Sequence, residues 1–479
     1  MEIQSTISAF QDILPNHNFE DGRSFSERFA ISRFKKKMEI PDPSRQKDLA
    51  DECWREYLLF DAGLPNKIVH PHGILYRARL LIHRWMQDYR DSSTVEFPKG
   101  SSFIATRGHN SVESWLAGNA WTTTPENSDR FFGLIRGHKA LNRALKKKYN
   151  SWYRKRGFDL SRKESDKVLW DFFQDPEAVA RWKFDRVVKY VRGSRFSTVP
   201  KNNTARRPIN IEPFGNVLVQ RSIGVGLRDM LKTVIGIDLE VLQDVHRDRI
   251  SDLTIATIDL KNASDAVSQA LVEFLFPKWF VKKLGRARSA LLLGHDQDYH
   301  MPKKISSMGN GFTFELMTTI LTAICRCLDD NATVFGDDII IDKNQATTLI
   351  EILESVGFAV NKEKSFVSGP FRESCGGNYH ETEGYIESFD FRYPLTIADC
   401  CVVYNKAVIL GRRYPSFARL TERLTAVIPK VLQGGPLESF AMPDHWRNFS
   451  SELPAYFACG SRGKFVHGRK TKERYHFRD

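Results

Sequence analysis

The sequence predicts an α+β protein, in which helices and antiparallel strands dominate different parts of one chain. Residues 50–63 ("ADECWREYLLFDAG") and 73–89 ("GILYRARLLIHRWMQDY") carry apolar side chains at helical spacing. Residues 331–342 ("NATVFGDDIIID") instead place two β-branched runs on either side of a Gly-Asp turn, as in a hairpin. Between them, residues 253–276 change from a β-rich run that ends at Asp259 to a helical pattern that begins near Ala263.

Composition and charge favour a globular protein that binds a polyanion. The chain has 479 residues, of which 41% are hydrophobic and 12% aromatic, enough to bury a large core divided among several subdomains. Its 71 Lys and Arg outnumber its 58 Asp and Glu and give a net charge of +13. An excess of basic residues favours association with polyanions, and nucleic acid is the leading candidate.

The cysteines and the amino terminus indicate a reduced, cytoplasmic setting. The cysteines are odd in number and show no paired CxxC spacing typical of zinc sites. We expect reduced thiols at Cys53, Cys325, Cys327, Cys375, Cys400, Cys401 and Cys459. The first residues show no basic region followed by an apolar segment, and the chain has no run of about 18 apolar residues. We therefore expect neither secretion nor membrane insertion.

Residues 1 to about 180 are expected to be largely helical, and the segment 136–167 within them is strongly basic. Tyr149, Trp152 and Tyr153 lie among its cations. A solvated helical face explains this pattern, but aromatic rings between cations also suit a channel for a single-stranded nucleic acid. Under the second interpretation, the candidate binding residues are Arg136, Lys146, Lys147 and Arg154.

Residues 195–213 ("RFSTVPKNNTARRPINIEP") predict another hairpin, with a basic tip. Asn202 and Asn203 supply its turn, and Pro200 and Pro208 limit strand pairing to sheet edges. An ordinary charged loop is one interpretation. The other is a clamp for a triphosphate, because Arg and Lys neutralise phosphate charge. The candidate residues are Arg195, Lys201, Arg206 and Arg207.

Two aspartates follow the β-rich run of residues 253–258. Asp259 closes a strongly apolar strand, where a carboxylate is more often buried or paired than on a loop. Asp265 lies six residues later, near a helix start, where a carboxylate is favoured by the helix dipole. Helix capping therefore explains Asp265 by itself, whereas Asp259 calls for a partner.

A glycine-rich loop leads into an apolar helix at residues 303–328. Gly309 and Gly311 would let the backbone approach a ligand closely, and Asn310 between them can both donate and accept hydrogen bonds. A structural turn is the alternative. Downstream, a helix is expected to end at Gly357, and further turns at Gly369–Pro370 and Gly376–Gly377 precede a basic, aromatic tail at residues 461–479.

Asp337 and Asp338 are expected to lie with Gly336 in the turn of the 331–342 hairpin. Neighbouring carboxylates repel each other, so the pKa of one or both would be raised unless cations balance them. A divalent metal would supply that balance. A solvated polar turn is the competing interpretation of this short motif.

The order of these features is more specific than any one of them, and it resembles the palm of template-dependent polymerases. There the strand-end aspartate is motif A, the Gly-Asn loop motif B and the aspartate hairpin motif C. The strings "VPKNNTARRPINIEP", "DLKNASDAVS", "ISSMGNGFTFEL", "FGDDII" and "GPFRESCG" resemble the RNA-directed RNA polymerase of single-stranded RNA bacteriophages, the Qβ replicase family. The resemblance covers about residues 190–380. Close members usually carry Tyr where this chain has Phe335, which keeps the aromatic ring and loses a hydroxyl.

The resemblance implies a right-hand fold with fingers, a palm of antiparallel sheet plus helices, and a thumb. It implies fingers at residues 1–240, the palm at 241–269 and 305–380, a return to the fingers at 270–304, and a thumb with the basic tail at 381–479. Residues 1–130 and the last hundred match by position alone.

The resemblance also assigns roles to single residues. Asp259 and Asp337 are the principal ligands that bridge two Mg²⁺ ions, or Mn²⁺, and Asp338 completes the site. Asp265 and Asn310 resemble the pair that contacts the ribose 2′-OH. Lys364, or else Lys362, could protonate the leaving pyrophosphate, although an ordinary surface lysine explains either. The nucleotide-binding residues implied are Lys201, Arg206, Arg207, Asp265, Ser307, Gly309 and Asn310, and Arg195 and Lys201 join the RNA-binding residues.

The expected substrates are NTPs and a single-stranded RNA template, in the cytoplasm of an infected bacterium. The resemblance further implies a complex with host elongation factors Tu and Ts and a host small-subunit ribosomal protein. A reverse transcriptase is the nearest alternative, but such enzymes usually block the 2′-OH with bulk near the Asp265 and Asn310 positions. A packaging protein without an active site would have no reason to place Asp259, Asp337 and Asp338 on strand ends.

Overall fold

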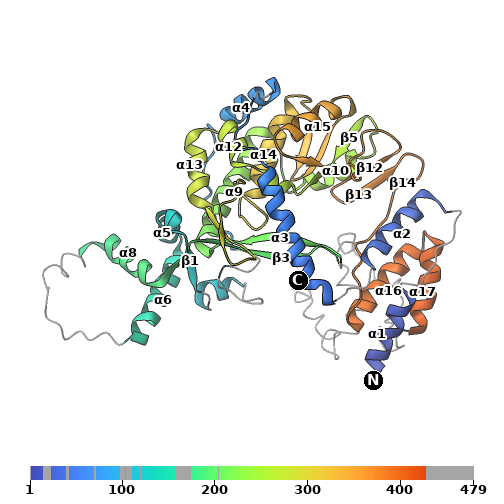
Figure 1. Ribbon diagram of the computed structural model, residues 1–479, viewed down its shortest axis with the longest axis horizontal. Coiled ribbons are helices and arrows are strands. Elements are labelled where there is room, and N and C mark those ends of the chain that lie inside the picture. Colours follow the sequence, from blue (N-terminus) through green and yellow to red (C-terminus); the bar gives the residue numbers. More distant parts are fainter. Residues whose placement is uncertain are drawn as a thin grey trace. The chain divides into compact units, whose positions relative to one another are not determined.

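A computed structural model describes residues 2–14, 23–38, 43–69, 72–97, 103, 111–118, 120–156, 174–202 and 204–427 (Figure 1). Asn203 of the predicted turn, residues 157–167 of the basic segment, Cys459 and the basic tail lie outside the described residues. The chain divides into two compact units. The first comprises residues 1–49, 200–206 and 379–479, and the second comprises residues 50–199 and 207–378.

The first unit is mainly helical. Its elements are α1 (Glu2–Ile13), α2 (Phe25–Lys37), β14 (Gly384–Tyr385), α16 (Ile397–Gly411) and α17 (Pro415–Val427). Its core contains the rings of Phe34 and Phe391, whose centroids lie 4.8 Å apart in an edge-to-face arrangement. Glu383 accepts hydrogen bonds from the Phe25 and Ser26 amides at 2.7 and 2.9 Å, so a carboxylate satisfies free amides at the start of α2.

The second unit mixes helices with short sheets. Its helices are α3 (Gln46–Gly63), α4 (Gly73–Trp85), α5 (Ser128–Gly137), α6 (Lys139–Arg156), α8 (Pro176–Val187), α9 (Phe214–Ile235), α10 (Leu242–Arg249), α11 (Ala263–Ala266), α12 (Gln269–Leu275), α13 (Lys278–Ala287), α14 (Thr313–Arg326) and α15 (Ala346–Ser355). Its strands are β1 (Trp121–Thr123), β2 (Val188–Tyr190), β3 (Gly193–Pro200), β4 (Arg206–Ile211), β5 (Ile255–Ile258), β6 (Leu260–Lys261), β7 (Leu291–Leu293), β8 (Tyr299–His300), β9 (Thr333–Phe335), β10 (Asp338–Asp342), β11 (Ala359–Val360) and β12 (Phe371–Ser374), with β13 (Gly377–His380) at its boundary.

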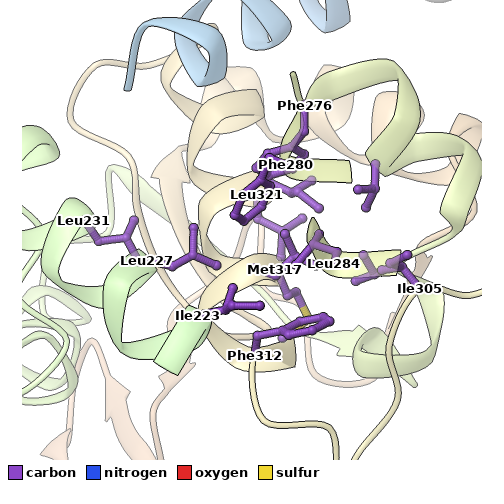
Figure 2. Packing of buried hydrophobic residues seen from close by; sticks show 14 of the residues in the cluster. Ile223, Leu227, Leu231, Phe276, Phe280, Leu284, Ile305, Phe312, Met317 and Leu321 are labelled. Atoms are coloured by element: carbon purple, nitrogen blue, oxygen red, sulfur yellow. The ribbon is translucent and has the colours of Figure 1, made fainter. Parts of the chain in front are cut away.

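Helix α14 lies at the centre of the second unit's core (Figure 2). Residues Thr313–Cys325 of this helix are buried almost throughout, so it presents no solvated face. Helix α9 packs against it with Ile223, Leu227 and Leu231, which recur every four residues and therefore share one face. Burying one such side chain contributes roughly 1.5–3 kcal/mol, so α14 is fixed in place before any polar contact is counted.

A three-stranded antiparallel sheet, ordered β5-β10-β9, carries the predicted aspartates. Strand β10 is its central strand, and Ile339 pairs with Ile258 on one side while Asp338 pairs with Phe335 on the other. The apolar residues of β5 and β10 are buried, which explains their continuous β-branched runs.

A four-stranded sheet, ordered β4-β3-β7-β8, contains the basic hairpin. Strand β4, with Pro208, is an edge strand, as the sequence predicts, and Pro200 ends β3. Strand β7 pairs in parallel with β3 through Gly193 and Leu291, so residues 270–304 return to the sheet that holds this hairpin.

The predicted α+β class is confirmed, and most predicted elements lie where the pattern places them. Three boundaries differ. Asp338 is the first residue of β10 and not part of the turn, which consists of Gly336 and Asp337. The later turn lies at Cys375–Gly376, where both residues have positive φ. The helix expected from Ala263 is split into α11 and α12, because the Ser268 hydroxyl accepts from the Leu271 amide and caps a new helix.

Two further expectations concern the described residues alone. The thiols of Cys53, Cys325, Cys327, Cys375 and Cys400 are free and buried. In the part of the chain that the structure describes, no helix is both long and apolar enough to cross a membrane.

Candidate active site

Three carboxylates meet at one end of the β5-β10-β9 sheet. Asp259 follows the last residue of β5, and Asp338 is the first residue of β10. Because Ile339 pairs with Ile258 in an antiparallel register, the next position places Asp338 opposite Asp259. Asp337, the residue before Asp338, lies in the tight turn between β9 and β10. The sheet register thus brings together residues that lie nearly 80 positions apart in the sequence.

Cations among the described residues offset the charges of these carboxylates only in part. Asp337 as a whole residue is exposed at the turn, but loss of solvation around its carboxyl and the Asp259 charge raise the pKa of that carboxyl, while Arg207 and Lys364 oppose the shift. Burial and the Asp337 charge raise the pKa of Asp338 to about 6. Such shifts mark a site with excess negative charge, which a divalent cation would relieve.

Asp259 is held by the loop that follows β11. One of its carboxylate oxygens accepts a hydrogen bond from the Asn361 amide at 2.6 Å, and its backbone N–H donates to the Ser365 hydroxyl at 3.1 Å. Sequence reasoning noted the lysines of this loop and missed Asn361 and Ser365. Their only signal was their position beside Lys362 and Lys364.

The carboxylates suit a divalent metal in chemistry, because Mg²⁺ and Mn²⁺ prefer hard oxygen ligands. Among the described residues, however, no three His, Cys, Asp or Glu side chains are placed so that they could hold an ion together. One oxygen of Asp259 is instead occupied by Asn361. The carboxylate oxygens of Asp259, Asp337 and Asp338 therefore suit a divalent metal, but among the described residues these side chains are not placed to hold one ion together.

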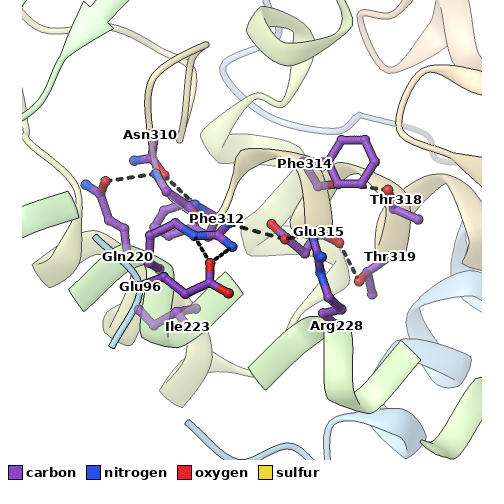
Figure 3. Close-up of polar contacts among 12 residues, drawn as sticks. Glu96, Gln220, Ile223, Arg228, Asn310, Phe312, Phe314, Glu315, Thr318 and Thr319 are labelled. Atoms are coloured by element: carbon purple, nitrogen blue, oxygen red, sulfur yellow. Dashed lines mark hydrogen bonds and ion pairs between the residues drawn. The ribbon is translucent and has the colours of Figure 1, made fainter. Parts of the chain in front are cut away.

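Helix α14 positions the aspartate hairpin. Gly336 has a φ of +65°, and a Cβ there would lie 2.5 Å from a ring carbon of Phe314, so the turn requires glycine. The Gly336 amide donates to the Thr318 hydroxyl at 3.1 Å. Thr318 in turn donates to the Phe314 carbonyl at 2.8 Å (Figure 3), and the Phe314 ring meets Phe335 edge to face at 5.1 Å.

The Gly-Asn loop is anchored mainly by protein groups. Gly309 has a φ of +107°, and a Cβ there would stand 2.3 Å from the Asn210 carbonyl, so its close approach is to strand β4. The Asn310 side chain accepts from the Phe312 amide at 3.1 Å (Figure 3) and donates to Glu212 at 3.5 Å. The Ser307 carbonyl accepts from the Asn310 amide at 3.1 Å, which closes the loop.

An ion network around the buried Glu315 joins this loop to helices α9 and α14 (Figure 3). Glu315 is only 1% exposed and accepts from Arg228 at 2.8 Å and from Arg221 at 3.3 Å. Arg221 also donates to the Gly311 carbonyl at 3.0 Å and forms an ion pair with Glu96. Removing one partner of such a network leaves a buried charge uncompensated. Sequence reasoning missed these residues, because nothing local distinguishes them from ordinary helix-surface charges.

Asp265 is buried and is not a helix cap. Its backbone amide, not its carboxylate, makes the local turn bond to the Asn262 carbonyl, and α11 has no side-chain cap. The carboxylate pairs with Lys304 at 3.2 Å, and the nearby Ser307 hydroxyl favours its charged form. The Ser307 carbonyl accepts from the Asn310 amide, so Ser307 belongs to the Asn310 loop.

The predicted basic residues occupy several places. Arg207, Lys362 and Lys364 are exposed. The charges of Arg207 and Lys364 act on the Asp337 carboxyl. Lys364 also lies 3.9 Å from Glu373. Arg195 is half-buried in β3, and Lys201 and Arg206 belong to the hairpin tip, which is grouped with the first unit.

Helix α6 carries the other predicted cations. Lys146, Lys147 and Arg154 are exposed on it, and Arg136 in α5 forms an ion pair with Glu177 at 3.0 Å. Tyr149 is buried between the cations and lies 5.3 Å from the Trp182 ring of α8. This aromatic residue therefore packs α6 against α8 and is not available for base stacking.

Comparisons with known proteins agree on one family. The family described as "RNA replicase, beta-chain" matches residues 163–446, more than half of the chain. The RNA-directed RNA polymerase subunit beta of Enterobacteria phage SP is 39% identical over 231 residues, 46% of this chain and 40% of that protein. The subunit of the same name from Escherichia virus Qbeta is 37% identical over 251 residues, 49% of this chain and 42% of that protein. The matched part thus spans less than half the length of these relatives.

A solved structure of the RNA-dependent RNA polymerase from bacteriophage phi12 was also found. It is 12% identical, covers 89% of this chain and 76% of its own, and superposes with a TM-score of 0.43.

Proposed function

Since this chain belongs to the RNA replicase beta-chain family, we propose that it is the catalytic subunit of a viral RNA-directed RNA polymerase. It would replicate a single-stranded RNA phage genome by nucleotidyl transfer from NTPs. The observation that carries this proposal is the meeting of Asp259, Asp337 and Asp338 at one end of a buried antiparallel sheet, with raised pKa values for Asp337 and Asp338. Carboxylates with perturbed pKa values that share one site are typical of catalytic centres.

In this proposal the three aspartates hold two Mg²⁺ ions, with Mn²⁺ as a substitute. When bound, the metals stabilise the negative charge that develops on the attacking and leaving oxygens. Asn361 holds the Asp259 carboxylate in the site, and the Thr318–Gly336 hydrogen bond holds the turn that carries Asp337.

Basic side chains would bind the incoming nucleotide. The charge of Arg207 acts on Asp337, and Lys201 and Arg206 precede Arg207 in the sequence of the hairpin. These cations would neutralise the triphosphate. Lys364 would give a proton to the leaving pyrophosphate, because its charge also acts on Asp337.

The sugar would be selected by the loop that contains Ser307, Gly309 and Asn310, together with Asp265. The Ser307 hydroxyl favours the charged form of the Asp265 carboxylate, and the Asn310 amide donates to the Ser307 carbonyl, so one residue links the two polar groups. Discrimination against deoxynucleotides would arise because a missing 2′-OH leaves buried polar groups unpaired.

The larger assembly is proposed from the family alone. Fingers at residues 1–240 and 270–304, a palm at 241–269 and 305–380, and a thumb from 381 would form a right hand. The relatives are named as subunits, and we propose that host elongation factors Tu and Ts and a small-subunit ribosomal protein complete the enzyme in the host cytoplasm. Single-stranded RNA would bind the cations of α6 and β3.

The test is RNA synthesis by the purified chain, in complex with its host factors, on single-stranded RNA with Mg²⁺ and labelled NTPs. We expect complementary RNA from the unmodified protein and none from Asp337→Asn, which keeps the side chain's shape and loses its charge. RNA affinity should stay nearly unchanged, because it comes mainly from phosphate contacts. Asp342→Asn, at the other end of β10, is the matched control and should keep activity. Substantial synthesis by Asp337→Asn would remove Asp337 from catalysis.

A further inference from the structure

A buried lysine next to the proposed sugar-binding residues has no role so far. The side chain of Lys304 is 1% exposed. Its ammonium lies 3.2 Å from an oxygen of Asp265, 3.9 Å from an oxygen of Asp61, and 3.5 Å from the centre of the Tyr57 ring. Burying an ammonium group is costly unless it is paired, and here two carboxylates and an aromatic face compensate it.

The backbone of Lys304 is fixed from several sides, so its side chain has a defined direction. Its carbonyl accepts from Arg288 at 2.7 Å. Its amide and that of Lys303 donate to the Asp61 carboxylate, at 3.4 and 3.1 Å. A β-bridge also pairs Lys304 with Ser268, three residues beyond Asp265. The ammonium and the Asp265 carboxylate are therefore held on paired segments.

Tyr57 extends this arrangement to the Gly-Asn loop. Its ring faces the Lys304 ammonium, and its hydroxyl lies 3.4 Å from the Ser307 hydroxyl. The same hydroxyl accepts from Asn210 at 3.0 Å, and the Asn210 backbone binds the loop at Met308. Tyr57, Asp265 and the stretch from Lys304 to Ser307 thus bring polar groups together from three segments of the chain.

The charge of Lys304 determines the state of Asp265. Burial raises the pKa of the Asp265 carboxyl, and the Lys304 ammonium opposes that rise, while burial lowers the pKa of Lys304 and the carboxylates oppose that fall. Without the ammonium, the buried Asp265 carboxylate would lose the cation it is paired with, and protonation of Asp265 would be favoured. An ionised carboxylate accepts a stronger hydrogen bond from a hydroxyl than a neutral acid does.

We propose that Lys304 is a positioning residue for ribonucleotide selection: it holds Asp265 as an oriented, charged acceptor for the ribose 2′-OH. The inference rests on the proposed function, in which Asp265 and Asn310 contact that hydroxyl. Lys304 itself touches neither the sugar nor the reacting phosphate. Its effect should therefore fall on the choice of sugar and not on nucleotidyl transfer as such.

The experiment compares incorporation of a single NTP and its matching dNTP by the assembled enzyme, as kcat and KM for each. In Lys304→Met, which keeps length and loses charge, the ribo-to-deoxy ratio of kcat/KM should fall on the order of tenfold to a hundredfold. The loss should lie mainly in a higher KM for the NTP, because a binding contact is weakened. The dNTP values should change by less than about threefold. Lys303→Met, whose side chain donates to the carbonyls of Ala62 and Leu64, is the matched control and should keep the ratio.

Two further variants distinguish positioning from mere stability. Asp265→Asn should lower the ratio as much as Lys304→Met, and the double variant should lower it no further, because both changes remove one interaction. If Lys304→Met does not fold, Asp61→Asn is measured in its place. Of its two carboxylate partners Lys304 then keeps Asp265, and the ribo-to-deoxy ratio of kcat/KM should be kept.

Three results would overturn the proposal. They are an unchanged ratio in Lys304→Met, an equal loss for NTP and dNTP, or a loss in Asp61→Asn as large as in Asp265→Asn. If the unmodified enzyme and the variants all discriminate against the dNTP to the same extent, the role of Lys304 is refuted and the proposed function is not. An unmodified enzyme that makes no RNA would refute the proposed function as well.

Discussion

The hydrogen bond between Thr318 and Gly336 allows a direct test of how the aspartate turn is positioned. The Thr318 hydroxyl accepts from the Gly336 amide at 3.1 Å and donates to the Phe314 carbonyl at 2.8 Å. Thr318→Val has nearly the same shape and χ1 preference, so it removes the hydroxyl and leaves packing almost unaltered. The change leaves a buried amide without its partner, one residue before Asp337.

The expected magnitude follows from the cost of an unpaired buried amide, which is about 1–3 kcal/mol. Local opening of the turn should become easier by that amount. Since about 1.4 kcal/mol corresponds to a factor of ten, the Gly336 amide should exchange its hydrogen roughly 5- to 150-fold faster. Hydrogen exchange followed by mass spectrometry of peptides that cover residues 333–340 measures this directly. RNA synthesis should fall by about tenfold or more, because small displacements of catalytic groups are costly.

The neighbouring residue provides the control. Thr319 is equally buried, and its hydroxyl donates to the Glu315 carbonyl at 2.7 Å, just as Thr318 donates to Phe314 (Figure 3). Thr319→Val therefore removes the same bond within α14 and leaves the turn alone. Equal exchange of the Gly336 amide in the two variants would show that the hydroxyl of Thr318 does not hold the turn, and the reasoning would be refuted.

Two other predictions follow from the same geometry. Lys364→Gln should slow nucleotide incorporation by about a hundredfold while Lys362→Gln changes it by less than about twofold, because the Lys364 charge acts on the Asp337 carboxyl; equal single-turnover rates would contradict the assignment. Burial lowers the pKa of His246 to about 4, whereas in the unfolded chain its imidazole binds a proton near pH 6.5. The contribution of His246 to stability is therefore complete above pH 6.5 and is lost as the pH falls towards 4. The difference in unfolding free energy between the wild type and His246→Gln should shrink by about 3 kcal/mol from pH 7 to pH 4 in denaturant titrations, and a difference independent of pH would exclude the mechanism.

The sequence predicts those parts of the fold that depend on local rules. The turn at Gly336 needs a positive φ, which glycine supplies cheaply, and the β-branched runs beside it suit a buried strand whatever their partners are. Asp259 could be placed at a strand end for the same reason. What a local pattern cannot provide is exact register, and so Asp338 was expected in the turn although it pairs with Phe335 as the first residue of β10.

A local sequence pattern does not show which side chains become partners in the folded chain. Asp265 was expected to cap a helix when taken alone, because its neighbours in the sequence offer a helix start and no visible cation. Its partner, Lys304, lies 39 residues away in a "KK" pair, where one lysine is half-buried and the other is buried. Only the bridge to Ser268 and the bonds of Asp61 and Arg288 decide which lysine faces inward.

Contacts between residues far apart in the sequence also explain why the site depends on α14, a helix whose own sequence looks like ordinary apolar core. One side of this helix holds the aspartate turn through Thr318, while Glu315 on the same helix binds Arg221, which holds the Gly-Asn loop at Gly311. A displacement of α14 would therefore move the proposed metal ligands and the proposed sugar-binding loop together. Its almost complete burial makes such a displacement costly, because every direction of movement opens space in a close-packed core. The apolar residues that look like simple core are thus what keeps the two polar parts of the site in register.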